Sequence, residues 1–200
     1  DSGTKKIVVS DNGIGMNKED AMLAFSRHAT SKLKDLDDLF NISSLGFRGE
    51  ALPSIASVSH IYLQTSKDGI GTSIFLNGGV IERIENSDLS VGTTIEVKDL
   101  FYNTPARRKF LKKSSQEAAY IGDILTRLIL ARPGISFKYI NDGKTVLHSP
   151  GDGSLANAVQ AVYGLETIQN MLPVHYSGGQ VAIDGYISGV EMEKSNRTYQ

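Results

Sequence analysis

The chain has 200 residues, of which 40% are hydrophobic and 22% charged, with a formal net charge of −1. This composition excludes a disordered chain, and the near-zero charge means that nucleic-acid binding would need a local basic patch. The chain has no cysteine, which excludes disulfides and thiolate metal sites and predicts an intracellular protein. No apolar run reaches the length of a membrane span, so we expect no membrane partner.

The first half of the chain predicts helices packed on a sheet. Residues 5–10 predict a buried strand, after which Asn17 can cap a helix. Two further helices are expected, one over residues 36–40 and one that begins near Gly49. Strand-like runs follow over residues 61–65, 72–76, 80–84 and 93–97.

The second half begins with Thr104 and Pro105, which predict a helix start, and a longer helix is expected from Ser114 with Glu117 completing a capping box. The sequence Asn141-Asp142-Gly143 predicts a hairpin between two strands. A helix over 155–163 and a strand over 181–188 follow. The apolar stripe of the longer helix is predicted to be Ala118, Ile121, Ile124, Leu125 and Leu128.

These elements predict an α+β fold, a two-layer sandwich of helices on a mixed, mostly antiparallel sheet. Residues 150–153, with the sequence Pro-Gly-Asp-Gly, are the best linker candidate. We therefore expect one domain over residues 1–150 and the start of a smaller α/β domain over residues 151–200. The first residue is not Met and a strand follows at once, so we interpret the sequence as part of a longer protein.

The segment Asp11-Asn12-Gly13-Ile14-Gly15-Met16 follows the first strand. Asn-Gly after a strand commonly forms a hairpin turn, but here a capped helix follows instead of a returning strand. At a strand end, Asp11 can accept a hydrogen bond from an exocyclic base amine, while Gly13 and Gly15 let a flat ring approach the backbone. This arrangement favours adenine, whose amine is a donor, over guanine, which presents a carbonyl there.

The segment Gly46-Phe47-Arg48-Gly49-Glu50-Ala51-Leu52 offers a phosphate site. Backbone amides of a glycine turn at a helix N-terminus carry partial positive charge, and Arg48 could add to it. A plain helix start is the alternative. Thr30, Ser31 and Lys32 offer hydroxyls and a cation to a phosphate or ribose, although such a tripeptide is common by itself.

Other nucleotide and metal motifs fail on inspection. Gly13-Ile14-Gly15 lacks the third glycine of a dinucleotide-binding fingerprint, and Gly143-Lys144-Thr145 lacks the earlier glycine of a phosphate loop. The histidines lack metal-ligand spacing, so structural or solvated side chains are expected at His28, His60, His148 and His175.

The three segments together resemble motifs of the MutL mismatch-repair family, which belongs to the GHKL ATPases. The resemblance rests on residues 11–16, 27–32 and 46–52. Residues 91–97 resemble the last nucleotide motif of these ATPases, and residues 101–110 resemble a stretch typical of MutL itself. The match is specific over residues 5–132 and continues more loosely to the end.

The resemblance implies an ATP site in which Asp11 and Thr93 lie at the adenine, and Gly13 and Gly15 shape the pocket. Thr30, Ser31 and Lys32 would lie in the lid. In the family, a glutamate base and an asparagine that holds Mg²⁺ lie on a helix before the first strand. Both would therefore lie upstream of residue 1, and this sequence alone would bind nucleotide weakly and would not hydrolyse it. The phosphates would be wrapped by Gly46, Phe47, Arg48, Gly49, Glu50, Ala51 and Leu52.

The resemblance also implies the function of the intact protein. ATP binding and slow hydrolysis would drive lid closure, N-terminal dimerisation and the coordination of repair partners on DNA. The partners would be a MutS-type mismatch-recognition protein, double- and single-stranded DNA bound without sequence preference, and a second copy or a paralogue in a dimer. The location would be the cytoplasm in a bacterium or the nucleus in a eukaryote, and any endonuclease would lie in a C-terminal region outside this sequence.

Alternatives to this interpretation stay open. An ATPase of another GHKL branch, such as a topoisomerase subunit, would need a gyrase-like lid, and Phe47-Arg48 and Ala51-Leu52 argue against one. A non-catalytic interaction module would keep the fold without nucleotide. A basic run could contact DNA phosphates or be only a solvated helix face; it consists of Arg107, Arg108, Lys109, Lys112 and Lys113.

Overall fold

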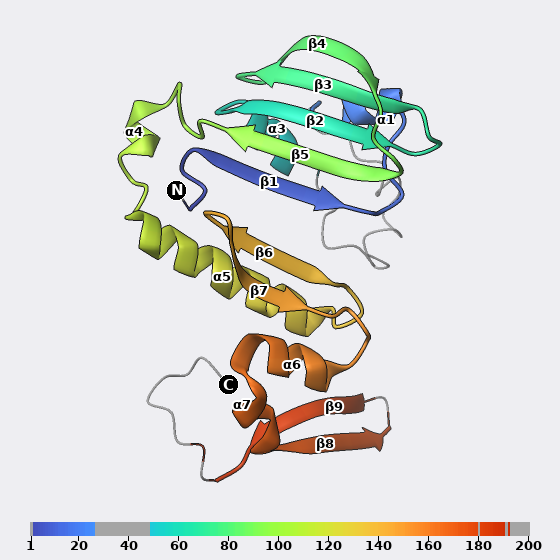
Figure 1. Ribbon diagram of the computed structural model, residues 1–200, viewed down its shortest axis with the longest axis vertical. Helices are drawn as coiled ribbons and strands as arrows, with labels where there is room; N and C mark the ends of the chain where they lie inside the picture. The colour runs from blue at the N-terminus through green and yellow to red at the C-terminus, as the bar shows by residue number, and fades with distance from the viewer. Residues whose placement is uncertain (1, 27–48, 180, 191, 193–200) are drawn as a thin grey trace. The chain divides into compact units, whose positions relative to one another are not determined.

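The computed structural model describes residues 2–26, 49–179, 181–190 and 192 (Figure 1). The chain divides into two compact units, Asp1–Glu117 and Ala118–Gln200, and the boundary falls within helix α5 (Ser114–Ala131). The helix expected over residues 36–40 lies outside the described residues. The division into domains over 1–150 and 151–200 stays a prediction.

A five-stranded sheet forms the first unit, in the order β1-β5-β2-β3-β4 (Figure 1). Every neighbouring pair in it is antiparallel, which confirms the predicted α+β class. Strand β5 lies between β1 and β2. The strand of this sheet that comes first in the sequence, β1, therefore pairs with the one that comes last, β5. The strands are β1 (Lys6–Asp11), β2 (His60–Ser66), β3 (Gly71–Asn77), β4 (Val80–Ser87) and β5 (Gly92–Lys98).

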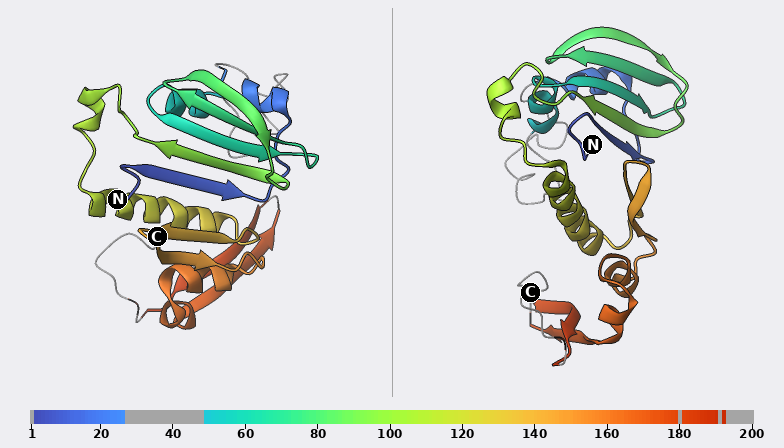
Figure 2. Two further views of the ribbon diagram at one scale, coloured as in Figure 1. Left: turned by 45° about the horizontal axis from the view of Figure 1, so that its top comes forward. Right: turned by 60° about the vertical axis from the view of Figure 1, so that its left-hand side comes forward.

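Two short helices, α1 (Lys18–Leu23) and α3 (Ala51–Ala56), cover one face of this sheet (Figures 1 and 2). Helix α1 begins as predicted, because the side chain of Asn17 accepts a hydrogen bond from the Asp20 N–H over 2.7 Å. The helices bury apolar side chains of alternate strand positions, which face the same side of a strand. The core consists of Ala21, Phe25, Ala56, Ile61, Leu63, Ile74 and Leu76.

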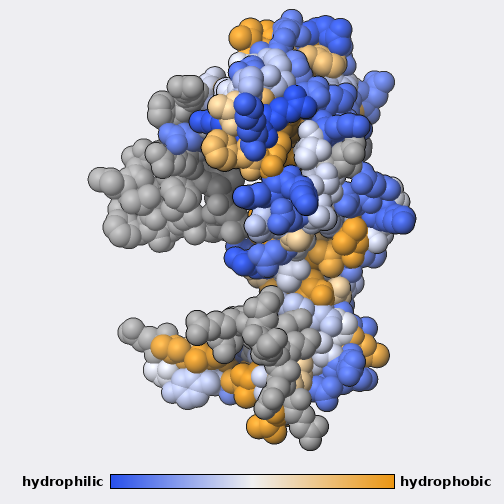
Figure 3. Space-filling view, turned by 90° about the vertical axis from the view of Figure 1, so that its left-hand side faces the viewer, coloured by the Kyte–Doolittle hydropathy of each residue, from blue (hydrophilic) through white to orange (hydrophobic). Residues whose placement is uncertain are grey.

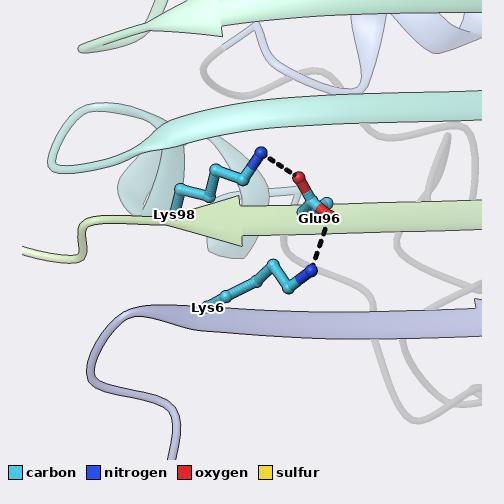
Figure 4. Close-up of polar contacts among 3 residues, drawn as sticks. All are labelled: Lys6, Glu96 and Lys98. Atoms are coloured by element: carbon cyan, nitrogen blue, oxygen red, sulfur yellow. Dashed lines mark ion pairs between the residues drawn. The ribbon is translucent and has the colours of Figure 1, made fainter. Parts of the chain in front are cut away.

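The opposite face of the sheet carries polar side chains. Glu96 on β5 pairs with the Lys98 ammonium at 2.5 Å and with the Lys6 ammonium at 3.5 Å (Figure 4). The hydrogen bond from Lys98 lowers the pKa of the Glu96 carboxyl, against a smaller opposing effect of burial, and the same bond raises the pKa of Lys98. This cluster stabilises the β1–β5 edge and lies on the face away from the helices.

Helix α4 (Pro105–Arg108) follows β5 through a tight turn, in which Asp99 and Phe101 adopt positive φ angles of 52° and 66°. Thr104 precedes Pro105 as predicted, but its side chain makes no capping hydrogen bond. Tyr102 ties the turn to the sheet. Its ring stacks on His60 at 4.2 Å, and its hydroxyl donates to Asn77 Oδ1 over 2.6 Å.

In its described residues, the second unit contains two antiparallel hairpins, the larger part of α5 and two further helices. The first hairpin is the predicted one, and its turn residues Asp142 and Gly143 have φ angles of 48° and 77°, as a type I′ turn requires. Helix α6 contacts both β7 and α7. Besides α5, the elements are β6 (Phe137–Asn141), β7 (Lys144–Ser149), α6 (Leu155–Tyr163), α7 (Leu165–Gln169), β8 (Met171–Gly178) and β9 (Val181–Ser188).

Helix α5 differs from the prediction in two details. Ser114 already lies inside the helix, and the Glu117 carboxylate accepts a hydrogen bond from the backbone N–H of Lys112 over 2.7 Å, so the capping box is wrong. Four residues of the predicted stripe are half-buried, namely Ala118, Ile121, Leu125 and Leu128. Ile124 is wrong, because it is 58% exposed, and the most buried residue of the helix is Ile129, which is 1% exposed.

Candidate functional site

The carboxylate of Asp11 lies at a strand end, as the sequence predicts. Asp11 is the last residue of β1 and stands opposite Thr93 of β5. Its Oδ1 accepts a hydrogen bond from the Gly13 N–H over 2.9 Å, and the residue is exposed. Since the chain continues into α1, the alternative of an Asn-Gly hairpin is wrong. The bond to Gly13 fixes the carboxylate and leaves Oδ2 able to accept a hydrogen bond from a bound group.

Three glycines let the backbone segments at this strand end approach one another. A Cβ on Gly13 would lie 2.9 Å from Asp11 Oδ1, so a side chain there would crowd the carboxylate. Gly15 has a φ of +63°, and a Cβ on it would lie 1.9 Å from the carbonyl oxygen of Ser66. Gly92 has a φ of +135°, and its Cβ would lie 2.3 Å from the Asp11 carbonyl oxygen. Any other residue at 15 or 92 would push β1, β2 and β5 apart.

A buried hydroxyl joins these segments. Thr65 of β2 stands opposite Thr93 of β5, and its Oγ1 lies 3.1 Å from Thr93 Oγ1. The same oxygen accepts a hydrogen bond from the Met16 N–H over 2.9 Å and donates to the Gly92 carbonyl over 3.1 Å. Thr65 has no exposed surface and Thr93 is 9% exposed. The network therefore ties the loop after β1 to the ends of β2 and β5.

The chemistry of this strand end fits one edge of adenine. Asp11 offers an oxygen acceptor, the exposed backbone at Gly13 leaves room beside it, and the Thr93 hydroxyl can donate or accept. Adenine presents an amine donor next to a ring-nitrogen acceptor on the same edge. The two side chains, opposite each other on β1 and β5, can match that pair.

The structure describes the second predicted segment only in part. Gly49 has a φ of +64° and precedes α3, whose first residue is Ala51. Glu50 occupies the position before the helix, and Leu52 packs against the core, so the side chain of Leu52 supports the fold. The other predicted residues, Thr30, Ser31, Lys32, Gly46, Phe47 and Arg48, lie outside the described residues, and their approach to Asp11 stays a prediction.

Two of the described histidines contact side chains that do not form a metal site with them. His60 stacks on Tyr102, and His175 Nδ1 pairs with Asp184 Oδ1 across β8 and β9. In residues 2–26, 49–179, 181–190 and 192, no group of three or more His, Cys, Asp and Glu side chains could hold a metal ion. Over the same residues, no helix has the length and apolar character that crossing a membrane requires.

Curated proteins match this chain over its whole length. The DNA mismatch repair protein MutL of Shouchella clausii is 47% identical over 199 residues, which is 100% of this chain and 30% of that protein. MutL of Lactococcus lactis subsp. cremoris is 47% identical over 201 residues, which is 100% of this chain and 31% of that protein. The chain belongs to the MutL family. It spans about 30% of the length of these relatives.

A solved MutL structure has the same fold. The MutL ATPase domain of Aquifex aeolicus, complexed with ADP, is 28% identical, with a TM-score of 0.66 over 86% of this chain and 60% of that chain. The α+β sandwich is thus the GHKL fold of MutL ATPase domains. No family model matches the chain.

In this MutL-family chain, the sequence did not predict a role for Thr65, and it indicated Gly92 only as part of the motif over residues 91–97. Thr65-Ser66 ends a strand, and nothing in the sequence alone shows that it lies beside Thr93. The pairing of β2 with β5 brings the two threonines together. An available signal was the repeated pattern of threonine at the apolar face of both strands, Ile61-x-Leu63-x-Thr65 and Thr93-x-Ile95-x-Val97.

Proposed function

We propose that this chain is the nucleotide-binding region of a MutL-type DNA mismatch-repair ATPase. In the intact protein, ATP binding and slow hydrolysis drive lid closure, N-terminal dimerisation and the coordination of repair partners on DNA. The observation that carries the proposal is the strand-end site, where Asp11, Gly13 and Thr93 lie together. The fold shared with an ADP-bound MutL ATPase domain supports it.

In this proposal Asp11 accepts a hydrogen bond from the adenine amine, and Thr93 bonds the adjacent ring edge. Gly13 and Gly15 keep side chains away from the base. Residues 30–32 belong to a lid, and residues 46–52 wrap the phosphates through backbone amides and Arg48. Mg²⁺ would neutralise negative charge on the phosphates and so favour hydrolysis.

The proposal extends to the partners of the intact protein. These are a MutS-type mismatch-recognition protein, a second copy or paralogue that pairs through the N-terminal region, and DNA bound without sequence preference. An intracellular location follows from such partners. The names of the relatives support the repair context, since both are DNA mismatch repair proteins.

The decisive experiment replaces Asp11→Asn in the full-length form, by which we mean this chain within a protein as long as its curated relatives. The Asn Oδ1 can still accept from the Gly13 N–H, and its amide NH₂ then faces the base. Because two donors oppose each other, we expect ATP affinity to fall about 10- to 100-fold. The affinity for inosine triphosphate, which has a carbonyl in place of the amine, should fall much less.

Equilibrium binding of ATP and inosine triphosphate checks this expectation. Asp68→Asn, an exposed change between β2 and β3, is the matched control and should leave both affinities unchanged. Equal affinity of Asp11→Asn and the unchanged protein for ATP would refute the placement of the base. An unchanged protein that binds no ATP, and gains no protease protection over residues 30–50 from an ATP analogue, would be a non-catalytic module.

A further inference from the structure

We infer that Thr65 is a positioning residue of the nucleotide site, which sets the direction of the Thr93 hydroxyl hydrogen bond and so contributes to the choice of adenine over guanine. The inference rests on the proposed function. It goes further because Thr65 itself does not touch the base: it is fully buried behind Thr93.

The hydrogen-bond count at Thr65 carries the inference. A threonine hydroxyl has one proton and two acceptor lone pairs. The Met16 N–H, 2.9 Å away, occupies one lone pair of Thr65. The single proton then goes either to the Gly92 carbonyl or to Thr93 Oγ1, both of which lie at 3.1 Å.

The two choices give Thr93 opposite properties. If the Thr65 proton goes to Gly92, Thr93 can donate to the free lone pair of Thr65 and then offers the base only lone pairs. If the Thr65 proton goes to Thr93, the Thr93 proton is free to donate to the base. Adenine offers an acceptor nitrogen beside its amine, whereas guanine offers an N–H donor at the same ring position. A donating Thr93 beside an accepting Asp11 therefore matches adenine. The Thr65 proton, which points to the Gly92 carbonyl in the free site, then turns to Thr93 when adenine binds and holds Thr93 in that state.

Thr65 also fixes the loop that carries the glycines. Met16 packs against the core and donates its N–H to Thr65, so the loop from Gly13 to Met16 is held against the end of β2. Without this bond, the Gly13 amide that orients Asp11 would lose its anchor. Both partners of the base edge, Asp11 and Thr93, thus depend on one buried oxygen.

The test compares Thr65→Val with Thr65→Ser in the full-length form. Valine keeps the shape and removes the hydroxyl, whereas serine restores it. We expect Thr65→Val to narrow the preference for ATP over GTP at least about 10-fold, and Thr65→Ser to recover most of it. Hydrogen exchange of the Met16 amide should accelerate at least about 10-fold in the valine variant and return towards the original rate in the serine variant.

The matched control is Thr167→Val. Thr167 is another buried threonine, whose hydroxyl donates to the Tyr163 carbonyl over 2.8 Å in the second unit. The Thr167→Val variant should lower the free energy of unfolding without changing the preference for ATP over GTP. An unchanged preference in Thr65→Val, while the unchanged protein binds ATP, would overturn this inference alone. Failure of the unchanged protein to bind ATP would overturn the proposed function, and this inference with it.

Discussion

Gly15 and Ser66 approach so closely that a Cβ on Gly15 would lie 1.9 Å from the Ser66 carbonyl oxygen. The two residues are far apart in the sequence, one in the loop after β1 and the other at the end of β2. Gly15 also has a φ of +63°, which other residues rarely adopt. This contact places the glycine loop against the sheet and so determines where the strand-end site forms.

Gly15→Ala should therefore destabilise the protein. The positive φ alone costs about 1–2 kcal/mol for a residue with a Cβ, and the overlap with Ser66 forces the loop to move. We expect the free energy of unfolding to fall by more than about 2 kcal/mol, measured by denaturant titration. Gly122→Ala is the control, because Gly122 lies in α5 with open space around it and should gain about 0.5–1 kcal/mol. Equal stabilities of the two variants would contradict this contact.

Gly13→Ala should instead affect binding more than stability. Gly13 has no positive φ, and the atom its Cβ would meet at 2.9 Å is the Asp11 carboxylate oxygen, which can rotate away. The rotation breaks the bond from the Gly13 N–H and misaligns the acceptor, so ATP affinity should fall about 10-fold. The free energy of unfolding should change by less than about 0.5 kcal/mol. Titration with a fluorescent ATP analogue measures the first effect. Gly134→Ala, with nothing within 4 Å of its Cβ, should leave affinity intact.

Glu96 predicts a pH dependence of stability. Its pKa in the folded protein is lowered from about 4.5, chiefly by the hydrogen bond from Lys98, so its contribution is present above pH 4.5 and is lost as the pH falls below that value. Lys98 has a raised pKa, so its contribution is present below about pH 10.5 and is lost as the pH rises further. The pair is near the surface, so solvent screens it and we expect its contribution to the free energy of unfolding to be small.

Unfolding of Glu96→Gln and the unchanged protein, compared between pH 3 and pH 7, tests this expectation. The difference between them should shrink towards pH 3 and also shrink in about 1 M salt, which screens the pair. A difference that stays constant over this pH range would show that the carboxylate contributes through packing rather than through its charge.

Much of the first unit could be predicted from the sequence because its signals are local. Apolar runs gave the strands, and Asn17 gave the start of α1. The expectation that the first strand is buried was wrong, because Val8 and Val9 of β1 are 49% and 62% exposed. Asp142-Gly143 gave the turn of the first hairpin in the second unit. Strand β8 was missed because Pro173 lies within it, and proline normally argues against a strand. It is tolerated where Pro173 stands opposite Tyr186 in an isolated two-stranded sheet, whose strands are both edges.

Local signals in the sequence indicated the candidate site only where its residues lie in one segment, and the family resemblance alone placed the distant Thr93 beside Asp11. Asp11, Gly13 and Gly15 follow one another, so their common role could be inferred from the sequence. The contribution of Thr65 depends on the pairing of β2 with β5, and a pairing between distant strands leaves no local signal. The predicted stripe of α5 was wrong only at Ile124, for a related reason: tertiary packing decides that Ile129 is buried and Ile124 is exposed.

The basic run after Thr104 allows a last prediction, on DNA binding. Arg107, Arg108, Lys109, Lys112 and Lys113 are all exposed, and none forms an ion pair with another described residue. The surface on the side of α4 mixes hydrophilic and apolar side chains (Figure 3), and Phe110, between the cations, is 82% exposed. Unpaired cations beside an exposed aromatic ring suit the phosphates and bases of a single strand.

We expect the double substitution Arg107→Gln and Arg108→Gln to weaken DNA binding of the full-length form in a salt-dependent way. Each lost phosphate contact should reduce the slope of log K against log salt concentration by about 0.7 for single-stranded DNA and about 0.9 for double-stranded DNA. Phe110→Ala should weaken single-stranded binding alone, because only unpaired bases can stack on the ring. The control, Lys138→Gln with Lys144→Gln, removes the same charge from the exposed β6–β7 hairpin. If both double variants lowered the slope of log K against log salt concentration equally, the net charge of the protein would govern DNA binding. A contact at the α4 surface instead predicts that only the loss of Arg107 and Arg108 lowers the slope.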